Sequence, residues 1–238
     1  MNGELDQIRE RYLRRAQSGR DGSVYSLLRP DQYMTQQEKE RIFLFILSRF
    51  DPAAIKTMKV LEIGCGGGVN ILQFLRWGFP PENIKGSELM PDLCAQARHL
   101  LPAAVEIIEG DALGLRLPED SFDIVLVSTV FTSILDESFR ALLAKKIWSL
   151  VRPSGAVLWY DFIYNNPSNP DVTAIPRRHV LELFPGARAL SHKVTLAPPI
   201  ARFVCRVHPP LYSLFNLFPF LRTHLIAWLE KPVPPDVG

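Results

Sequence analysis

The stretch Lys59–Asn70, KVLEIGCGGGVN, decides the fold. Residues 59–63 form a short apolar run that predicts a strand, and residues 70–77 have helical spacing that ends at Gly78. Between them, positions 64–68 hold four glycines, which let the backbone turn sharply and approach a ligand closely. The stretch therefore predicts the first strand of a parallel sheet with a ligand loop at its end.

Short apolar runs continue to alternate with helical periods after this loop. Further strands are predicted at residues 84–88, 105–109, 122–128, 155–162, 189–196 and 223–229, with helices at 91–101, 136–150 and 176–184. This rhythm is typical of an α/β fold. We expect a Rossmann-like, doubly wound, mostly parallel sheet of seven strands.

Two less regular regions flank this core. Leu5, Ile8 and Leu13 share one face of a predicted helix over residues 4–16. Thr35 and Glu38 have the spacing of a capping box, which predicts that a second helix begins at Thr35. Residues 197–222 are rich in proline and aromatic residues, so we expect an irregular C-terminal insertion there.

Composition narrows the class of protein. The 238 residues are 47% hydrophobic and 22% charged, as in soluble globular proteins. The net charge of +2 argues against a nucleic-acid partner, which would favour a basic excess. Cys65, Cys94 and Cys205 form no C-x-x-C pair, and the charged start MNGELDQIRE lacks the apolar core of a signal peptide. We therefore expect a cytoplasmic protein without a metal site.

Two acids stand at ends of predicted strands. Glu88 ends the second strand, where a carboxylate can accept hydrogen bonds from both hydroxyls of a ribose. Asp111 follows the third strand and can accept a hydrogen bond from an adenine amino group. Leu89 and Ala112 would cover the faces of the ring. Together with the glycine loop, these residues predict a nucleoside site.

Residues 55–165 resemble the class I S-adenosylmethionine-dependent methyltransferases. The resemblance rests on LEIGCGGG, Glu88, Gly110-Asp111, FDIVLV and the sequence RPSG before the fifth strand. It implies S-adenosylmethionine as cofactor, held by Glu62, Gly64, Cys65, Gly66, Glu88, Leu89, Asp111, Ala112 and Ser128. Glu62 would either orient the loop or reach the cofactor amino group through water, and Cys65 would have no catalytic role. The later pieces YDF, NNPSNPDV, LFPG and TLAPPIAR look like a bacterial subgroup that methylates glycans or related metabolites.

An alcohol acceptor would need a general base. Asp161, at the end of the fifth strand, is the first candidate, and a loop-capping acid is the alternative interpretation. His179 and His192 are the next candidates, although each also suits a structural or surface position. Tyr25 and Tyr33 precede the first strand and are candidate acceptor contacts.

We expect a methyltransferase that acts on a small molecule or glycan, most simply at oxygen. An NAD(P)-dependent oxidoreductase is a competing hypothesis, and Val69 in place of the last fingerprint glycine counts against it. A non-catalytic interaction module with the same fold is another. The expected single domain has a helical cap (1–55), a cofactor-binding core (56–165) and acceptor-side elements with the last strands (166–238).

The aromatic C-terminal segment has two interpretations. It either packs against the sheet or forms a membrane-facing surface beside Arg202, Arg206 and Arg222. The aromatic residues are Phe203, Tyr212, Phe215, Phe218, Phe220 and Trp228. This pattern is compatible with peripheral contact to the cytoplasmic face of a membrane. It is compatible with either a monomer or a homodimer.

Overall fold

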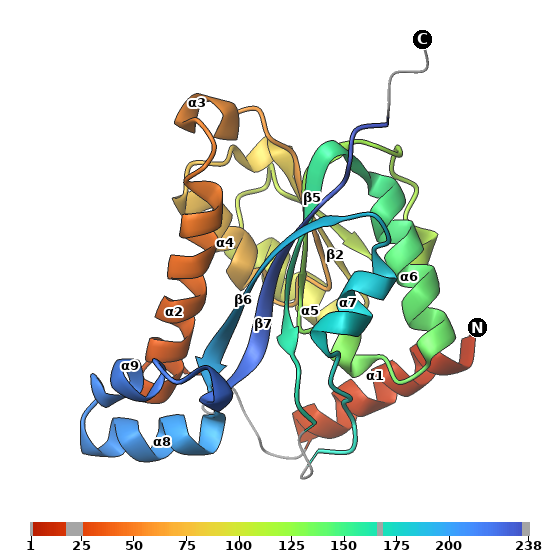
Figure 1. Ribbon diagram of the computed structural model, residues 1–238. Helices are drawn as coiled ribbons and strands as arrows, with labels where there is room; N and C mark the ends of the chain where they lie inside the picture. The colour runs from red at the N-terminus through yellow and green to blue at the C-terminus, as the bar shows by residue number, and fades with distance from the viewer. Residues whose placement is uncertain (1, 18–25, 166–168, 235–238) are drawn as a thin grey trace.

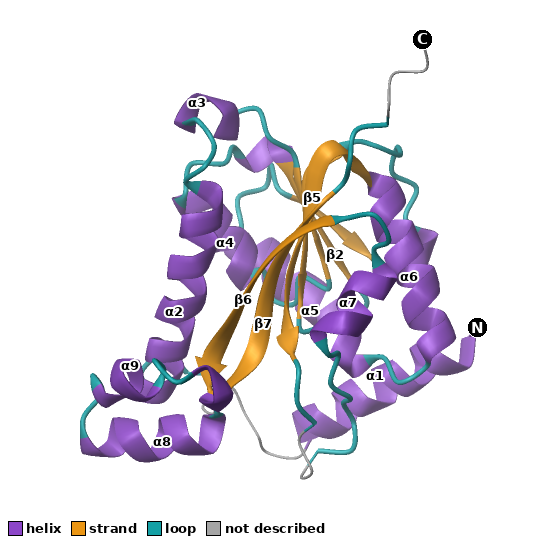
Figure 2. Ribbon diagram, in the orientation of Figure 1, coloured by secondary structure: helices purple, strands orange, loops and turns teal. Residues whose placement is uncertain are grey.

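A computed structural model describes residues 2–17, 26–165 and 169–234. One seven-stranded sheet, ordered β3-β2-β1-β4-β5-β7-β6, runs through the molecule with helices on both faces (Figure 1, Figure 2). The strands are β1 (Val60–Ile63), β2 (Ile84–Glu88), β3 (Glu106–Glu109), β4 (Phe122–Ser128), β5 (Val151–Phe162), β6 (Arg188–Leu196) and β7 (Arg222–Glu230). The expected Rossmann-like, mostly parallel α/β fold is confirmed.

The helices and short 3₁₀ turns connect the strands. The helices are α1 (Asn2–Gln17), α2 (Pro30–Leu47), α3 (Pro52–Ile55), α4 (Val69–Arg76), α5 (Pro91–Leu100), α6 (Glu137–Leu150), α7 (Arg177–Leu183), α8 (Pro198–Val207) and α9 (Leu211–Phe215). The 3₁₀ turns are η2 (Pro81–Asn83), η3 (Ala112–Gly114), η4 (Phe131–Ser133) and η5 (Pro219–Leu221). No helix in the described ranges has the length and apolar character needed to cross a membrane.

Strand direction gives the sheet one functional end. Strands β1 to β5 pair in parallel, whereas β7 is antiparallel to both β5 and β6. Strands β1 to β6 therefore all end at one side of the sheet, and β7 begins there. We call this side the carboxyl edge. Helix α1 lies at one end of this edge, and α8 and α9 lie at the other (Figure 1).

Two apolar layers bury the sheet. Alternate residues of β5 show the division, because Leu158 packs with α2 and α4 whereas Trp159 packs with α6 and α7. Both side chains are fully buried. Central strands that are covered on both faces are mostly apolar, which explains the apolar run IVLV at residues 124–127 of β4.

The prediction that the second helix begins at Thr35 was wrong. Helix α2 begins at Pro30, whose fixed φ suits the first helical turn, and Thr35 lies inside the helix. Glu38 is buried and accepts hydrogen bonds from Tyr212 Oη (2.7 Å) and Asn216 Nδ2 (2.6 Å). Its carboxylate therefore joins α2 to α9 instead of closing a capping box.

The prediction of an irregular segment over residues 197–222 was also wrong. This segment contains α8, α9 and η5. Its prolines stand at helix starts, where no intrahelical N–H bond is lost: Pro198 and Pro199 open α8, Pro210 precedes α9, and Pro219 opens η5. Proline content here marks boundaries between short helices.

Candidate functional site

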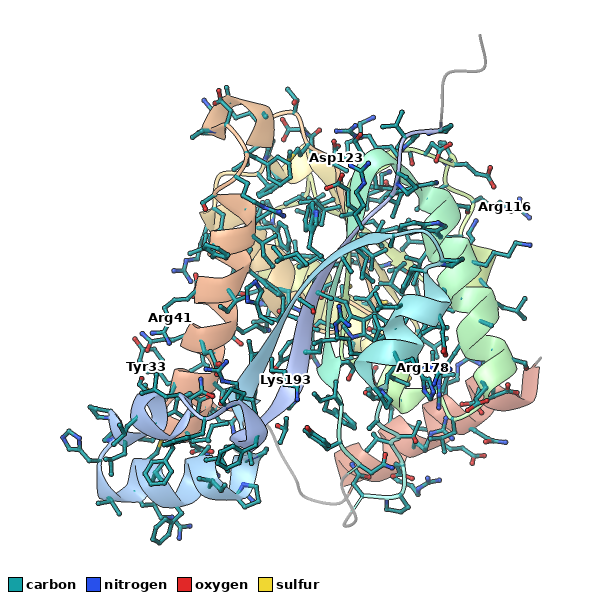
Figure 3. All side chains as sticks on the ribbon, viewed as in Figure 1. Tyr33, Arg41, Arg116, Asp123, Arg178 and Lys193 are labelled. Carbon is teal, nitrogen blue, oxygen red and sulfur yellow. The ribbon has the colours of Figure 1, made fainter. Side chains whose placement is uncertain are left out.

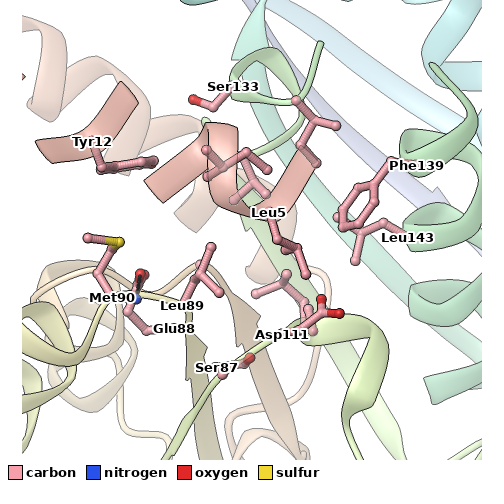
Figure 4. A pocket seen from close by; sticks show the side chains of 17 residues that line it. Leu5, Tyr12, Ser87, Glu88, Leu89, Met90, Asp111, Ser133, Phe139 and Leu143 are labelled. Atoms are coloured by element: carbon pink, nitrogen blue, oxygen red, sulfur yellow. Dashed lines mark hydrogen bonds between the residues drawn. The ribbon is translucent and has the colours of Figure 1, made fainter. Parts of the chain in front are cut away.

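A pocket with about 610 Å³ of empty space lies at the carboxyl edge. Its walls come from the ends of β1, β2 and β3, the loop after β4, and helices α1 and α6. The lining residues are Leu5, Ile8, Tyr12, Ile63, Gly64, Ser87, Glu88, Leu89, Met90, Gly110, Asp111, Ala112, Val130, Ser133, Ile134, Phe139 and Leu143. Figure 4 shows Glu88 and Leu89 below α1, with Leu5 and Tyr12 of that helix above them.

The glycine loop after β1 has a backbone that requires glycine. Gly64, Gly66 and Gly68 have φ of +68°, +53° and +89°. A Cβ on Gly64 would lie 2.6 Å from Cγ2 of Val130, so a side chain there would displace a pocket residue. The Gly64 N–H donates to Ser87 O at 2.7 Å, which ties the loop to β2.

Glu88 is fixed in the pocket wall by backbone donors. Its Oε2 accepts a hydrogen bond from Gly66 N (2.9 Å), and its Oε1 accepts one from Met90 N (2.9 Å). A carboxylate oxygen has two acceptor positions, so each oxygen can accept a second hydrogen bond. The geometry suits a ligand with two adjacent hydroxyl groups.

Asp111 is held by the turn after β3. Gly110, with φ of +126°, reverses the chain, and Asp111 Oδ1 accepts a hydrogen bond from Leu113 N at 2.9 Å. Asp111 Oδ2 has no hydrogen-bond partner among the residues that the structure describes. Ala112 and Leu89 lie in the same wall. One carboxylate oxygen with apolar neighbours can bind the edge of a planar ring.

A buried polar chain lies beneath the glycine loop. Glu62 Oε1 accepts a hydrogen bond from Asn70 Nδ2 (2.6 Å), and Asn70 Oδ1 accepts one from Lys39 Nζ (2.9 Å). Burial raises the pKa of Glu62 to about 8 and lowers that of Lys39 to about 8. Glu62 Oε2 is buried and has no partner within the described ranges, so an acceptor is left for a cationic donor.

Sequence reasoning missed Lys39 and Asn70. The Lys39 ammonium lies 5.2 Å from the ring centroid of Tyr160 and 6.0 Å from that of Phe43. The available signal was a lysine four residues before Phe43, on the apolar face of α2. A buried lysine needs a partner, which the spacing alone does not identify.

The remaining predicted cofactor residues adjoin the pocket without lining it. Cys65 is buried beside Gly86 of β2, and burial raises the pKa of its thiol. The thiol therefore stays protonated at neutral pH, in keeping with its expected lack of a catalytic role. Ser128 is the half-buried last residue of β4. Gly66 meets the site through its bond to Glu88.

Asp161 is enclosed by the turn η4. Its Oδ1 accepts a hydrogen bond from Thr132 Oγ1 (2.6 Å), and its Oδ2 accepts one from Thr132 N (3.2 Å). The side chain is 1% exposed, and burial raises its pKa to about 7. The geometry favours a positioning role, because η4 contributes Ser133 to the pocket.

The two predicted histidines lie away from the pocket lining. His179 is exposed on α7. His192 lies on β6 under α2, where its ring contacts Phe45 edge to face with centroids 5.8 Å apart. Of the predicted acceptor contacts, Tyr33 is half-exposed at the start of α2 (Figure 3), and Tyr25 lies outside the described residues.

A third histidine stands at the carboxyl edge. His224, near the start of β7, stacks on Tyr160 with ring centroids 5.1 Å apart, and its Nδ1 is 3.0 Å from Thr223 Oγ1. Burial, and then the charge of Lys39, lower its pKa to about 4, so the imidazole is neutral at pH 7. Sequence reasoning passed over it because it opens a predicted strand.

Helix α1 covers the pocket and is held by a buried ion pair. Arg11 Nη2 donates to Glu4 Oε1 (2.7 Å) and to Ser133 O (3.1 Å). Glu4 Oε1 also accepts a hydrogen bond from Leu135 N at 2.9 Å. These contacts join α1 to the loop after β4. The two elements that form neighbouring walls of the pocket are therefore linked by hydrogen bonds.

The chain is similar to known methyltransferases. A family model for a methyltransferase domain matches residues 60–155. The chain is 32% identical over 112 residues to the fatty-acid O-methyltransferase of Mycolicibacterium smegmatis, covering 46% of this chain and 39% of that protein. It is 30% identical over 131 residues to the ubiquinone biosynthesis O-methyltransferase of Stutzerimonas stutzeri, covering 53% of each. The chain thus spans about half or less of these curated relatives.

A solved structure shares the fold over nearly the whole chain. The 1,6-didemethyltoxoflavin-N1-methyltransferase of Burkholderia thailandensis has a TM-score of 0.63 and 17% identity, covering 95% of this chain and 88% of that one. The glycine loop, the acids of β1 and β2, and strands β1 to β4 all fall inside residues 60–155. Residues 60–155 therefore match a methyltransferase domain, and the chain as a whole shares the fold of that solved structure.

Proposed function

We propose that this chain binds S-adenosylmethionine at the carboxyl edge and transfers its methyl group to a hydroxyl of a small-molecule or glycan acceptor. The observation that carries the proposal is that Glu88 and Asp111 line one pocket with Gly64 of the glycine loop, while Glu62 is buried behind the lining within electrostatic range of Glu88. Each acid comes from a different strand end, so together they match several polar groups of one ligand.

The residues present fit this cofactor. Glu88 would accept the two ribose hydroxyls, and Asp111 Oδ2 would accept the adenine amino group. The unpartnered Glu62 Oε2 suits the ammonium of the methionine part. The pocket lining within the described ranges contains no Lys or Arg, which agrees with a nucleoside that carries no phosphate.

When bound, the cofactor supplies an electrophilic methyl group on sulfur. The chain then has to align the acceptor and exclude water. Leu5 and Ile8 of α1 cover the pocket from the solvent side, and Glu4 and Arg11 hold that helix in place. We place acceptor selection where the neutral His224 of β7 stacks on Tyr160 of β5 and Lys39 of α2 lies over the Tyr160 ring.

The curated relatives support oxygen as the methylated atom. Both relatives described above are named as O-methyltransferases. A hydroxyl acceptor loses a proton during transfer, so the acceptor site needs a group that takes up this proton.

Calorimetric titration with S-adenosylhomocysteine tests the site. Glu88→Ala and Asp111→Ala should each weaken binding about tenfold or more, because a hydrogen bond to a charged group contributes roughly 1.5–3 kcal/mol. Glu109→Ala is the matched control, since Glu109 ends β3 but is exposed and pairs with Arg98. Unchanged affinity in both site variants, or tight binding of NAD alone, would overturn the proposal.

The transfer itself is tested with methyl-labelled cofactor. The wild-type protein is incubated with a metabolite and glycan extract, and mass spectrometry locates the label. We expect an O-methylated product whose yield falls with Asp111→Ala when the cofactor concentration is limiting. Cofactor binding without any labelled product would instead support the non-catalytic interaction module.

A further inference from the structure

Large apolar side chains are exposed on one surface of α8, α9 and η5. We call this surface the docking face. Its members are Phe203 (70% exposed), Val207 (67%), Leu214 (53%), Leu217 (68%), Phe218 (47%) and Phe220 (74%). Phe203 and Val207 are four residues apart and share one side of α8. The ring centroids of Phe218 and Phe220 lie 5.7 Å apart, and exposed large apolar side chains gathered in one segment mark an interaction site.

The helices that carry the docking face are anchored to the rest of the protein by buried contacts. The opposite side of α8 buries Ala201, Val204 and Cys205 against Tyr212. Tyr212 Oη donates to Glu38 Oε2 (2.7 Å), and the same oxygen accepts a hydrogen bond from Thr195 N (2.9 Å). Since the inner side is packed and hydrogen-bonded to α2 and β6, the outer apolar side chains have no place in the core.

The charged side chains of the segment that carries the docking face are positive. Residues 198–222 contain three arginines and no Asp or Glu. Arg222 is occupied by the carbonyls of Asn216 and Lys193, whereas Arg202 and Arg206 are exposed and form no ion pair among the described residues. The carboxylate next to α8 is Asp31, which is buried and pairs with Arg29 at 3.3 Å. Apolar residues beside unpaired arginines match an anionic lipid surface.

We propose that the docking face binds anionic membrane lipid and sets the carboxyl edge against the bilayer. Residues 197–221 leave the sheet after Leu196 and return at Arg222, positions that pair in the ladder at this edge. A membrane on the docking face would therefore lie at the carboxyl edge, at the end opposite α1 (Figure 1). The proposal of membrane binding does not depend on the proposed function. The delivery of an apolar acceptor from the lipid to the site does rest on the proposed methyl transfer.

Sedimentation with vesicles tests the proposal. The full-length protein should sediment with phosphatidylglycerol vesicles and much less with phosphatidylcholine vesicles. Phe203→Ser combined with Phe220→Ser should weaken binding about tenfold or more. The matched control is Leu100→Ser with Leu142→Ser, which removes exposed leucines (46% and 44%) from α5 and α6 and should change nothing.

A second pair of variants isolates the charge. Arg202→Gln with Arg206→Gln should weaken binding to phosphatidylglycerol by about fivefold per arginine. Arg41→Gln with Arg116→Gln is the control, because these exposed arginines lie away from α8 (Figure 3). Circular dichroism and titration with S-adenosylhomocysteine check that each variant is folded with an intact site.

Three results would overturn the proposal. The wild-type protein fails to sediment with phosphatidylglycerol, the two phenylalanine substitutions leave binding unchanged, or light scattering shows a dimer that these substitutions dissociate. The last result would assign the docking face to a second copy of the chain. Vesicle binding without S-adenosylhomocysteine binding would overturn the proposed function alone.

Discussion

At the scale of single residues, two buried carboxyl groups have different functions. Glu88 is held by backbone N–H groups of Gly66 and Met90 at the pocket wall, where it can still accept ligand hydrogen bonds. Asp161 uses both oxygens to hold Thr132, and its burial raises its pKa to about 7. One carboxyl group is thus available for binding, and the other fixes the loop that shapes the pocket.

Asp161 should make stability depend on pH. Its carboxyl stays protonated in the folded chain up to about pH 7, whereas in the unfolded chain it ionises near the ordinary aspartate pKa of 3.8. Its contribution to folding is therefore complete below about pH 4 and is lost as the pH rises toward 7. Asp161→Asn removes this slope, so the variant should become more stable relative to wild type across that range.

Urea unfolding between about pH 4.5 and about pH 7.5 measures this difference. Loss of hydrogen bonds to Thr132 gives a constant offset, so the slope is the informative quantity. Asp92→Asn, on the exposed side of α5, should run parallel to wild type. Parallel curves for Asp161→Asn as well would contradict the raised pKa.

Local spacing was sufficient to predict part of the candidate site. Gly64, Glu88 and Asp111 were predicted because strand ends fix where such residues lie, and all three line the pocket. Lys39 was missed because its partner Asn70 is 31 positions away, and their contact depends on how α2 crosses the sheet. The sequence shows where each histidine stands along the chain, but it does not show which side chains surround the ring in the fold.

At the scale of elements, the segments before and after the core differ most from expectation. Their short helices are stabilised by contacts distant in sequence, such as Glu38 with Asn216. Tertiary packing of this kind overrides local propensity, and it is invisible in a window of ten or fifteen residues. The strands were predicted well because their apolar runs reflect burial on both faces.

Helix α1 should control how fast the cofactor leaves. Arg11→Met keeps the length of the side chain but leaves Glu4 buried without its cation, which is strongly destabilising for a buried pair. Because Arg11 and Glu4 tie α1 to the loop after β4 through Ser133 O and Leu135 N, loss of this pair should let the helix open locally. We expect dissociation of S-adenosylhomocysteine to accelerate about tenfold or more.

Stopped-flow displacement of bound S-adenosylhomocysteine measures the rate. Arg9→Met is the matched control on the same helix, because the Arg9–Asp6 pair is exposed and 3.5 Å long. That variant should dissociate at the wild-type rate. Equal rates for both variants would show that α1 does not cover the bound cofactor.

At the scale of the whole molecule, the last third of the chain completes the sheet. β5 pairs with β4 on one side and with β7 on the other, so its interior residues are buried. The sequence predicts a single domain with a cap, a core and acceptor-side elements, and the division of function among these three parts stays a prediction. Strands β6 and β7 lie far along the chain from β1, and all three belong to one sheet.

A chain that ends at residue 165 should fail to fold stably. It would expose the apolar edge of β5, including Leu158 and Trp159, which is an aggregation hazard. A chain that ends at residue 234 keeps every described strand and should behave as the full chain does. Light scattering should show aggregation of the first alone, and calorimetry should show one unfolding transition for the second.

A soluble chain ending at residue 165 with its own cooperative transition would contradict this expectation. So would two separate transitions in the full chain. Either result would mean that residues 56–165 form an independent domain, with the last strands as an attached unit.

The excursion between β6 and β7 is closed at its base, because Ala197 N donates to Leu221 O at 2.8 Å. At the sheet, this segment therefore connects β6 and β7 as an ordinary hairpin turn does, whatever the number of residues in the segment. Lengthening a connection whose ends are already fixed costs little entropy. In evolution or in engineering, this excursion can be exchanged as a unit when the replacement supplies hydrogen-bond donors for the buried Glu38, so a new acceptor or a new surface can be acquired while the glycine loop and its acids stay unchanged.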